Sequence, residues 1–148
     1  MNSAGFSHLA AQQRGITLIE VLVTVLVLSI GLLGLAGLQL MSLRNNQSAM
    51  ERSVGVVQSY SIIEAIRADP DSAKNGRFNI DVDDTPSGST FPSQALTKWR
   101  EQLVLNLGES ASGSVSCNST RCIVTVQWDD QRGTAGSDEQ QMVTEVRL

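Results

Sequence analysis

The stretch QQRGITLIEVLVTVLVLSIGLLGLAGLQ, residues 12–39, contains one carboxylate, Glu20, at the entry to a long apolar segment. From Val21 to Leu38, eighteen residues carry no charge, and Val, Leu and Ile dominate them. A bilayer core roughly 30 Å thick needs about 20 helical residues, so residues 16–38 are long enough to span it. A carboxylate at membrane depth costs on the order of 2.5–3.5 kcal/mol at a helix centre. Glu20 therefore indicates a function beyond anchoring.

The helical pattern continues past the apolar segment. Apolar side chains recur at three- and four-residue steps from Gln39, the period of a helical stripe, and no proline interrupts them before Pro70. We therefore expect one helix of about 50 residues, from Ile16 to roughly Ala68. The predicted stripe consists of Met50, Val54, Val57, Tyr60, Ile62, Ile63 and Ile66.

Residues 69–148 predict a small head. Turn residues at 75–76 and 86–88 mark an irregular segment from Arg77 to Ser89. A second helix is expected from Ser93 to about Leu107, stopped by Gly108. β-Branched and alternating residues then predict three strands, at 113–117, 121–129 and 141–148.

These elements together predict an α+β fold. The second half of the long N-terminal helix should pack on a small antiparallel sheet, with the short second helix beside it. Trp99 and Trp128 are expected in the core, because each falls on an apolar face. Asp129 and Asp130 follow the second strand and are expected to be turn residues.

Catalytic and metal-binding motifs are lacking in the sequence. The only histidine is His8, so beyond it Ser–His and Cys–His nucleophiles and His-ligated metals are excluded. The acidic residues Asp81, Asp83 and Asp84 depart from the EF-hand pattern, since Asp84 stands at its glycine position and Thr90 at its bidentate glutamate. We expect a solvated loop there, and neither an enzyme nor a cofactor.

The net charge and the two cysteines bear on the binding partners and the cellular compartment of the protein. The formal net charge is −4 and no cluster of five basic residues occurs, so a nucleic-acid interface is not supported. Cys117 and Cys122 flank the four-residue turn NSTR, a separation that a disulfide can bridge. An oxidised pair, favoured over two reduced thiols, indicates an extracytoplasmic compartment.

Three interpretations of the N-terminus compete. A secretory signal peptide, cleaved after a small residue such as Ala36, has an apolar region of about 7–15 residues, and this one is longer. A plain signal anchor explains the length but gives no role to Glu20 or to the Arg14–Gly15 junction. The third interpretation uses all of these residues, because RG-ITLIEVLV resembles the type III signal of type IV prepilins.

That resemblance implies a function for each residue of the motif. Residues 1–15 would be a leader, cut between Gly15 and Ile16 by a prepilin peptidase, and Ile16 would be N-methylated at a position where the family most often has phenylalanine. Glu20 would be the fifth mature residue, and its carboxylate would meet the amine of a neighbouring subunit. Because a paired charge is tolerable in lipid and an unpaired one is costly, this pair would favour assembly. The alternative is a glutamate that snorkels to the membrane interface.

The C-terminal half resembles one branch of the pilins. LTKWREQL and SGSVSCNSTRCIVTVQWDD are similar to the PilV family of minor pilins, where a Trp-bearing helix precedes a C-x4-C pair and a strand ending in tryptophan and acidic residues. The resemblance implies a structural subunit of a pilus priming or tip complex. Its partners would be other minor pilins, the major pilin, the prepilin peptidase/methyltransferase and the inner-membrane assembly machinery. Twitching motility and adhesion are associations of the family.

The same resemblance implies a location. Residues 16–38 of the 16–68 helix would lie in the bacterial inner membrane, N-in, with the head 69–148 in the periplasm, and the chain would later join the filament at the cell surface. Two rivals remain. A minor pseudopilin of type II secretion shares the N-terminal signature, and a DNA-uptake pilin would need a basic head. Removal of the leader's single charge, Arg14, instead takes the net charge from −4 to −5.

Overall fold

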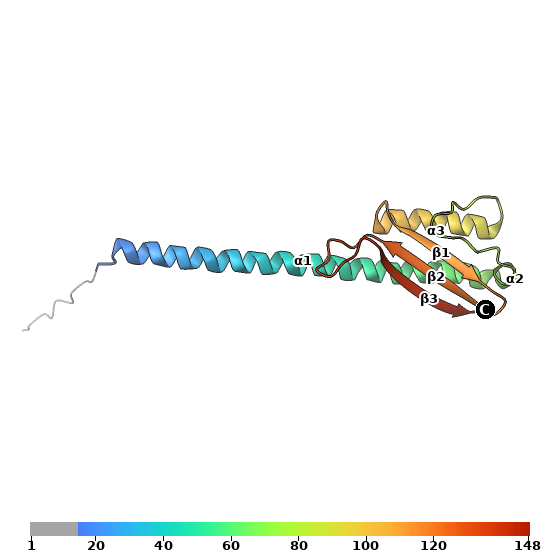
Figure 1. Ribbon diagram of the computed structural model, residues 1–148, viewed down its shortest axis with the longest axis horizontal. Coiled ribbons are helices and arrows are strands. Elements are labelled where there is room, and N and C mark those ends of the chain that lie inside the picture. The colour runs from blue at the N-terminus through green and yellow to red at the C-terminus, as the bar shows by residue number, and fades with distance from the viewer. Residues whose placement is uncertain (1–14) are drawn as a thin grey trace, which may run out of the picture. The chain divides into compact units, whose positions relative to one another are not determined.

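The computed structural model describes residues 15–148, and this part of the chain contains three helices and three strands (Figure 1). The helices are α1 (Leu18–Ala68), α2 (Pro70–Lys74) and α3 (Phe91–Leu107), and the strands are β1 (Ser112–Cys117), β2 (Arg121–Trp128) and β3 (Gln140–Arg147). The chain divides into two units, Met1–Gln39 and Leu40–Leu148. The long apolar N-terminal helix and the antiparallel sheet confirm the predicted α+β fold class.

Pro70 ends α1 and begins a helix that the sequence did not predict. The residue before a proline is driven out of the α region, so α1 stops at Ala68 and Asp69 becomes the cap of α2. The Asp69 carboxylate accepts a hydrogen bond from the backbone N–H of Ser72 at 3.0 Å. Hydrogen bonds from Ser72 lower the pKa of Asp69 below its usual value. α2 was missed because five residues are too few to show a helical period.

The sheet is a three-stranded antiparallel meander in the order β1-β2-β3. Alternate residues of β2 are fully buried, namely Cys122, Val124, Val126 and Trp128, whereas the residues between them are half-buried or exposed. This period of two assigns one face of the sheet to the core. The predicted strands were thus correct to within one residue at each end.

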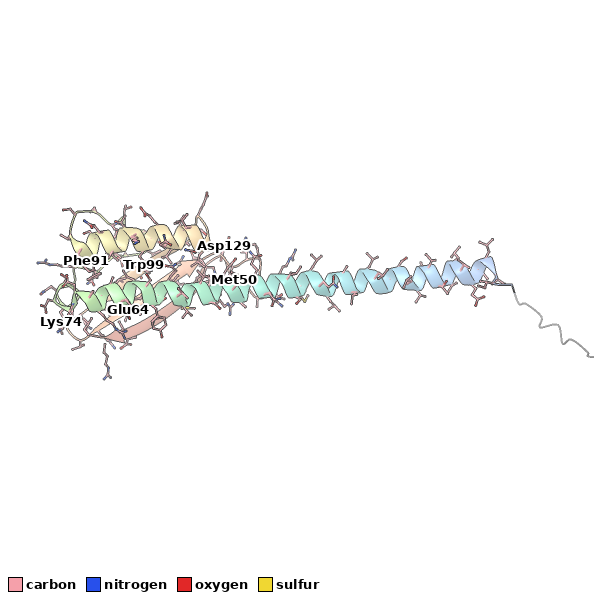
Figure 2. All side chains as sticks on the ribbon, turned by 180° about the vertical axis from the view of Figure 1, so that it is seen from behind. Met50, Glu64, Lys74, Phe91, Trp99 and Asp129 are labelled. Atoms are coloured by element: carbon pink, nitrogen blue, oxygen red, sulfur yellow. A yellow bond between two sulfur atoms is a disulfide. The ribbon has the colours of Figure 1, made fainter. Side chains whose placement is uncertain are left out.

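Helices cover the buried face of the sheet. Figures 1 and 2, which view the head from opposite sides, show α3 and the part of α1 beyond Leu40 side by side on the same face of the strands. The Trp99 indole N–H of α3 donates to the carbonyl oxygen of Gln58 in α1 at 2.9 Å. A Cβ built on Gly55 would lie 3.3 Å from the Trp128 ring, so this glycine lets α1 approach the sheet closely. Both tryptophans are core residues, as predicted.

The predicted stripe on α1 was only partly correct. Val54 packs against the core, and Ile62, Ile63 and Ile66 are buried in it. Met50, Val57 and Tyr60 are instead exposed, with exposed fractions of 69%, 64% and 56%. In the two turns of α1 before Ile62, the buried residues are Gly55, Gln58 and Ser59. Gly55 leaves room for the Trp128 ring, and a search for apolar periodicity does not find such a position.

The segment between α2 and α3 is anchored, although the sequence predicted an irregular stretch. The Phe78 side chain is fully buried, and Ile80 forms a backbone bridge to Val115 of β1. The predicted turns are present, since Gly76 has φ +70° and Gly88 φ +112°, values that favour glycine. This segment runs along the free side of β1 and covers that edge of the sheet.

A disulfide joins Cys117 and Cys122 across the β1–β2 hairpin, where the two residues are direct cross-strand partners with Cα atoms 4.0 Å apart. Replacing both cysteines by alanine should lower the free energy of unfolding by about 2 kcal/mol, because the unfolded chain regains the entropy of a short loop. Denaturant unfolding of the full chain in detergent, followed by tryptophan fluorescence, measures this loss. Reductant should destabilise the wild type to the same extent and leave the double variant unchanged. A midpoint equal in oxidised and reduced wild type would contradict the expectation.

Candidate processing and assembly site

The predicted cleavage site lies outside any helix. Gly15, Ile16 and Thr17 have no regular secondary structure, and α1 begins at Leu18, two residues later than the predicted start. All three are exposed, Ile16 at 76%. A peptide bond inside a helix has its N–H and C=O committed to the i→i−4 ladder, whereas the Gly15–Ile16 bond has neither restraint. The bond that the motif assigns to the peptidase is therefore accessible.

Glu20 occupies the first turn of α1, with its side chain exposed. The backbone N–H groups of Glu20 and Val21 donate to the carbonyl oxygen of Thr17 at 3.0 and 3.3 Å, so this turn is already closed. A carboxylate in the first turn is stabilised by the positive end of the helix dipole. Glu20 is also the only charged residue from Ile16 to Leu43. The helix thus presents one negative charge at the start of a long apolar surface.

The apolar surface goes all the way round the helix. Every residue from 15 to 47 is exposed, and α1 is the one described helix long and apolar enough to cross a membrane. The two hydroxyl groups between Val21 and Leu38 are satisfied within the helix, since Thr24 donates to the carbonyl oxygen of Val21 and Ser29 to that of Val25 at 2.8 and 2.7 Å. A helix that is apolar on all sides is stable only when lipid or other helices surround it.

Three glycines of this segment make no close contact within residues 15–148. A Cβ built on Gly31, Gly34 or Gly37 would meet no atom within 4 Å apart from the helix's own backbone. Each glycine costs about 1 kcal/mol of helix propensity relative to alanine, and no packing contact among the described residues offsets this cost. Small residues at this spacing leave the helix surface open to close approach by another helix.

The predicted loop at residues 81–84 is held by an arginine. The Arg100 guanidinium of α3 donates to the carbonyl oxygens of Asp81 and Val82 at 2.6 and 3.0 Å. Burial lowers the pKa of Arg100, and the carboxylates of Asp84 and Asp83 act in the opposite direction. Within residues 15–148, no three His, Cys, Asp or Glu side chains gather as metal ligands would.

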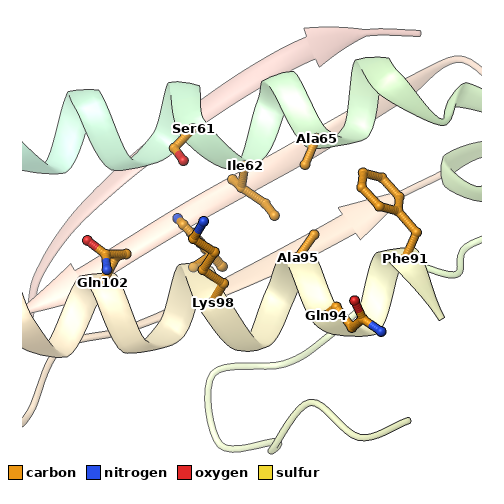
Figure 3. A pocket seen from close by; sticks show the side chains of 9 residues that line it. Ser61, Ile62, Ala65, Phe91, Gln94, Ala95, Lys98 and Gln102 are labelled. Carbon is orange, nitrogen blue, oxygen red and sulfur yellow. The ribbon is translucent and has the colours of Figure 1, made fainter. Parts of the chain in front are cut away.

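A groove between α1 and α3 has a volume of about 340 Å³ (Figure 3). Its walls are formed mainly by small and apolar side chains, including Ile62, Ala65 and Ala95, with Phe91 at one end. Lys98 is its one charged lining residue, and no carboxylate or thiol faces it. General acid–base chemistry needs a paired donor and acceptor, which this lining does not provide.

Asp130 is the residue whose position the sequence did not reveal. It was predicted to be turn chemistry, as its neighbour Asp129 is, since Asp129 accepts a hydrogen bond from the backbone N–H of Gln131 at 2.9 Å. Asp130 does begin a turn, since its carbonyl oxygen accepts from the backbone N–H of Gly133 at 3.0 Å, but its side chain is buried and accepts from the Ser48 hydroxyl at 2.7 Å and from Arg52 at 3.4 Å. Both partners lie on α1, about eighty residues earlier in the sequence, and no local signal points to them.

Further polar contacts attach the loop between β2 and β3 to α1. Arg132 pairs with Glu51 at 3.1 Å, and the Thr134 side chain hydrogen-bonds to Asn45. Together with Asp130 these contacts fix the loop along about two turns of the helix, from Asn45 to Arg52. The sequence analysis did not predict that Asp130, Arg132 and Thr134 contact α1.

Comparison with known proteins identifies the N-terminal segment. A family model described as the prokaryotic N-terminal methylation motif matches residues 10–36. No curated protein and no solved structure matches the chain. The motif indicates a type IV pilin-like or pseudopilin protein, a class of structural subunits that prepilin peptidase processes and a pilus or pseudopilus machinery assembles. The matched segment includes Gly15, Ile16 and Glu20; residues 1–14 lie outside the described part of the chain.

Proposed function

We propose that the chain is a minor pilin of the PilV family, cleaved between Gly15 and Ile16 and incorporated through α1 into a type IV pilus priming or tip complex. The observation that carries the proposal is the arrangement at the start of α1. An accessible Gly–Ile bond precedes, by one helical turn, the single carboxylate of the exposed apolar part of α1, residues 18–43. This arrangement falls within the segment that matches the methylation motif.

The chemistry of Glu20 follows from cleavage. Cleavage creates an α-amino group at Ile16, a basic group that is positively charged when protonated. It would lie at the positive end of the α1 dipole, which disfavours a second positive charge there. A carboxylate from a neighbouring helix relieves this repulsion, and the amine in turn removes the penalty of Glu20 in lipid. Methylation of Ile16 keeps the positive charge and therefore preserves the pair.

α1 also supports a location for the chain. One long apolar N-terminal helix is consistent with a membrane-anchored pilin. Residues 16–38 would lie in the inner membrane with the N-terminus inside, and residues 69–148 in the periplasm, until the subunit enters the filament. The oxidised Cys117–Cys122 pair supports a periplasmic head.

The choice of the PilV family rests on the C-terminal half. Trp99, Trp128 and the disulfide belong to one core, in which both tryptophans contact α1. The residues that carry the resemblance are thus a cooperating structural unit, which supports the proposal. A minor pseudopilin of type II secretion is the second candidate, favoured by the same N-terminal motif. Deletion of the gene separates them: the proposal expects loss of piliation and twitching, whereas loss of exoprotein secretion with intact pili would favour the pseudopilin.

Processing at Gly15 is tested by intact-mass analysis of the membrane protein, with and without a prepilin peptidase. With the peptidase, we expect a chain that starts at Ile16 and is one methyl group heavier; without it, residues 1–15 should remain. Gly15→Leu should block cleavage, because the side chain occupies the position where the motif requires none. Gly5→Leu, a matched change within the leader, should be processed normally. A wild-type chain that keeps residues 1–15 beside the peptidase would refute the proposal.

A further inference from the structure

The two edges of the sheet differ in how their backbone groups are satisfied. On the β1 side, the Val115 N–H donates to the Ile80 carbonyl oxygen at 3.0 Å, and the Val115 carbonyl oxygen accepts from the Ile80 N–H at 2.9 Å. The next outward-facing residue, Cys117, is also covered: its N–H donates to the Asn79 amide oxygen at 2.7 Å, and its carbonyl accepts from the Asn79 amide nitrogen at 3.3 Å. The chain itself therefore covers the β1 edge at Val115 and Cys117.

On the β3 side, the edge is open over most of the strand. The backbone N–H of Leu148 donates to the carbonyl oxygen of Thr120 at 3.0 Å. Because hydrogen-bonded and non-hydrogen-bonded pairs alternate along an antiparallel ladder, this bond shows which residues of β3 turn their backbone groups toward β2. Even-numbered residues of β3 turn their backbone groups toward β2, and odd-numbered residues turn theirs outward. Of the outward residues, Gln141 accepts one long bond from the Gln140 side chain at 3.5 Å. The backbone groups of Val143, Glu145 and Arg147 have no hydrogen-bond partner within residues 15–148.

We propose that the outer edge of β3 is a docking site for an extended strand of another protein chain, which would become the fourth strand of this sheet. An outward row of unpaired N–H and C=O groups is a template for strand addition. Sheets normally close or cover such edges, as this one does at Val115 and Cys117 of β1. β3 is eight residues long and regularly paired throughout, so its edge presents an uninterrupted surface.

A second copy of this chain fits the edge poorly. A symmetric β3–β3 pair would be antiparallel, and β3 runs in the same general direction as the part of α1 beyond Leu40 (Figure 1). The two helices would then run in opposite directions, whereas chains inserted in one membrane with one orientation run in parallel. A head-to-tail pairing of β3 with β1 of the next copy is blocked by Asn79 and Ile80. The preference for a different chain thus rests on the proposed membrane anchorage, although the open edge itself does not.

The side chains of β3 define the strand that would fit. Met142, Thr144 and Val146 lie on the side of the sheet that faces the core and are at least partly buried. The opposite side carries exposed residues, among them Val143 at 63%. Glu145 already pairs with Arg121 of β2 at 3.3 Å, and Arg147 forms no ion pair in the described part of the chain. The partner strand should therefore alternate, with apolar residues next to Met142 and Val146 and an acidic residue opposite Arg147.

Photo-crosslinking in intact cells tests the proposal with the full chain. The photoreactive residue p-benzoylphenylalanine is placed at Val143 or at Glu145, with Leu105, an exposed apolar residue of α3, as the control position. Mass spectrometry of the adducts identifies the crosslinked residue. The proposal expects both β3 positions to reach one extended segment of a single different protein, at sites two residues apart, because strands pair in register. Leu105 should not reach that segment.

A proline then tests the backbone contact itself. Val143→Pro removes an N–H that faces outward and is unused by β2, a position where an edge strand tolerates proline. Capture from position 145 should fall about tenfold, while Val143→Ala, which keeps the N–H, should retain it. The thermal unfolding midpoint checks the fold, and Arg147→Pro at the end of the same edge serves if Val143→Pro does not fold.

Capture that survives the proline, adducts equal to those from Leu105, or adducts with a second copy would overturn the proposal. Intact mass of the same sample separately reports cleavage at Gly15. A failure of the proposed function is therefore distinguished from a failure of strand docking at β3.

Discussion

Replacement of Glu20 by valine should reduce incorporation of the chain into filaments by about two orders of magnitude, while membrane insertion and cleavage remain normal. A charged group at membrane depth costs on the order of 2.5–3.5 kcal/mol, and without Glu20 the Ile16 amine bears that cost unpaired in the assembled bundle. At about 1.4 kcal/mol per factor of ten, this corresponds to roughly a hundredfold change. Insertion should not suffer, because valine is more favourable than glutamate in lipid.

Sheared filaments and membrane fractions, compared by quantitative immunoblotting, measure this partition. Glu64→Val is the matched control, since Glu64 lies on the same helix, is exposed and makes only a surface pair with Arg67 at 2.8 Å. Such pairs contribute little, so the control should incorporate normally. Glu20→Gln should incorporate as poorly as Glu20→Val if the charge is required, and as well as the wild type if only a hydrogen bond is required. Normal incorporation of Glu20→Val would show that the charge pair is dispensable.

Replacement of Trp128 by alanine should lower the free energy of unfolding by about 3–5 kcal/mol, the largest loss expected for any single residue of the head. Its side chain is 1% exposed and is the largest of the fully buried ones. It fills the space between the end of β2 and Gly55 of α1, so its removal leaves a cavity at the contact between sheet and helix. A domain of this size has little stability to spare, and the variant should be largely unfolded at 37 °C.

Denaturant unfolding of the full chain in detergent, followed by far-UV circular dichroism, checks the loss. Tyr60→Ala is the control, because Tyr60 is an exposed aromatic residue of α1 and its removal leaves no cavity. Trp128→Phe should cost much less than alanine. The Trp128 indole N–H is buried without a partner among the described residues, and phenylalanine removes that unsatisfied donor. A small effect of Trp128→Ala would show that α1 and the sheet are held together chiefly by other contacts.

The structure also gives the loop between β2 and β3 a defined position. Asp130 accepts hydrogen bonds from Ser48 and Arg52 through one carboxylate oxygen, and its other oxygen has no hydrogen bond within the described residues. A buried carboxylate is stable only with such partners, so the loop is held where Asp130 can reach α1. Sequence reasoning assigned Asp130 to a turn because the residue type fits one, and only the three-dimensional contact distinguishes it from Asp129.

The strands and the long helix could be predicted because their signals are local. The absence of proline before Pro70 and the alternation in β2 act through backbone sterics and a period that neighbouring residues share. α3 was predicted from Ser93 and begins at Phe91, since the Thr90 hydroxyl caps it by accepting from the backbone N–H of Ser93. The stripe on α1 was wrong where it reached Met50, Val57 and Tyr60. There the partner is a tryptophan, and the helix meets it with a glycine rather than a large apolar side chain.

The sequence by itself therefore determined the motif at Gly15–Glu20, the apolar length of α1 and the fold class, because each depends on residue type and spacing along the chain. Only the tertiary structure decided which face of α1 meets the sheet, that Asp130 is buried, and that β1 is covered while β3 is open. Those features depend on residues such as Asn79 and Cys117, which are thirty-eight positions apart in sequence and adjacent in space. Hydrogen bonds and close packing act over a few ångströms of space, and sequence spacing carries no record of them until the chain has folded.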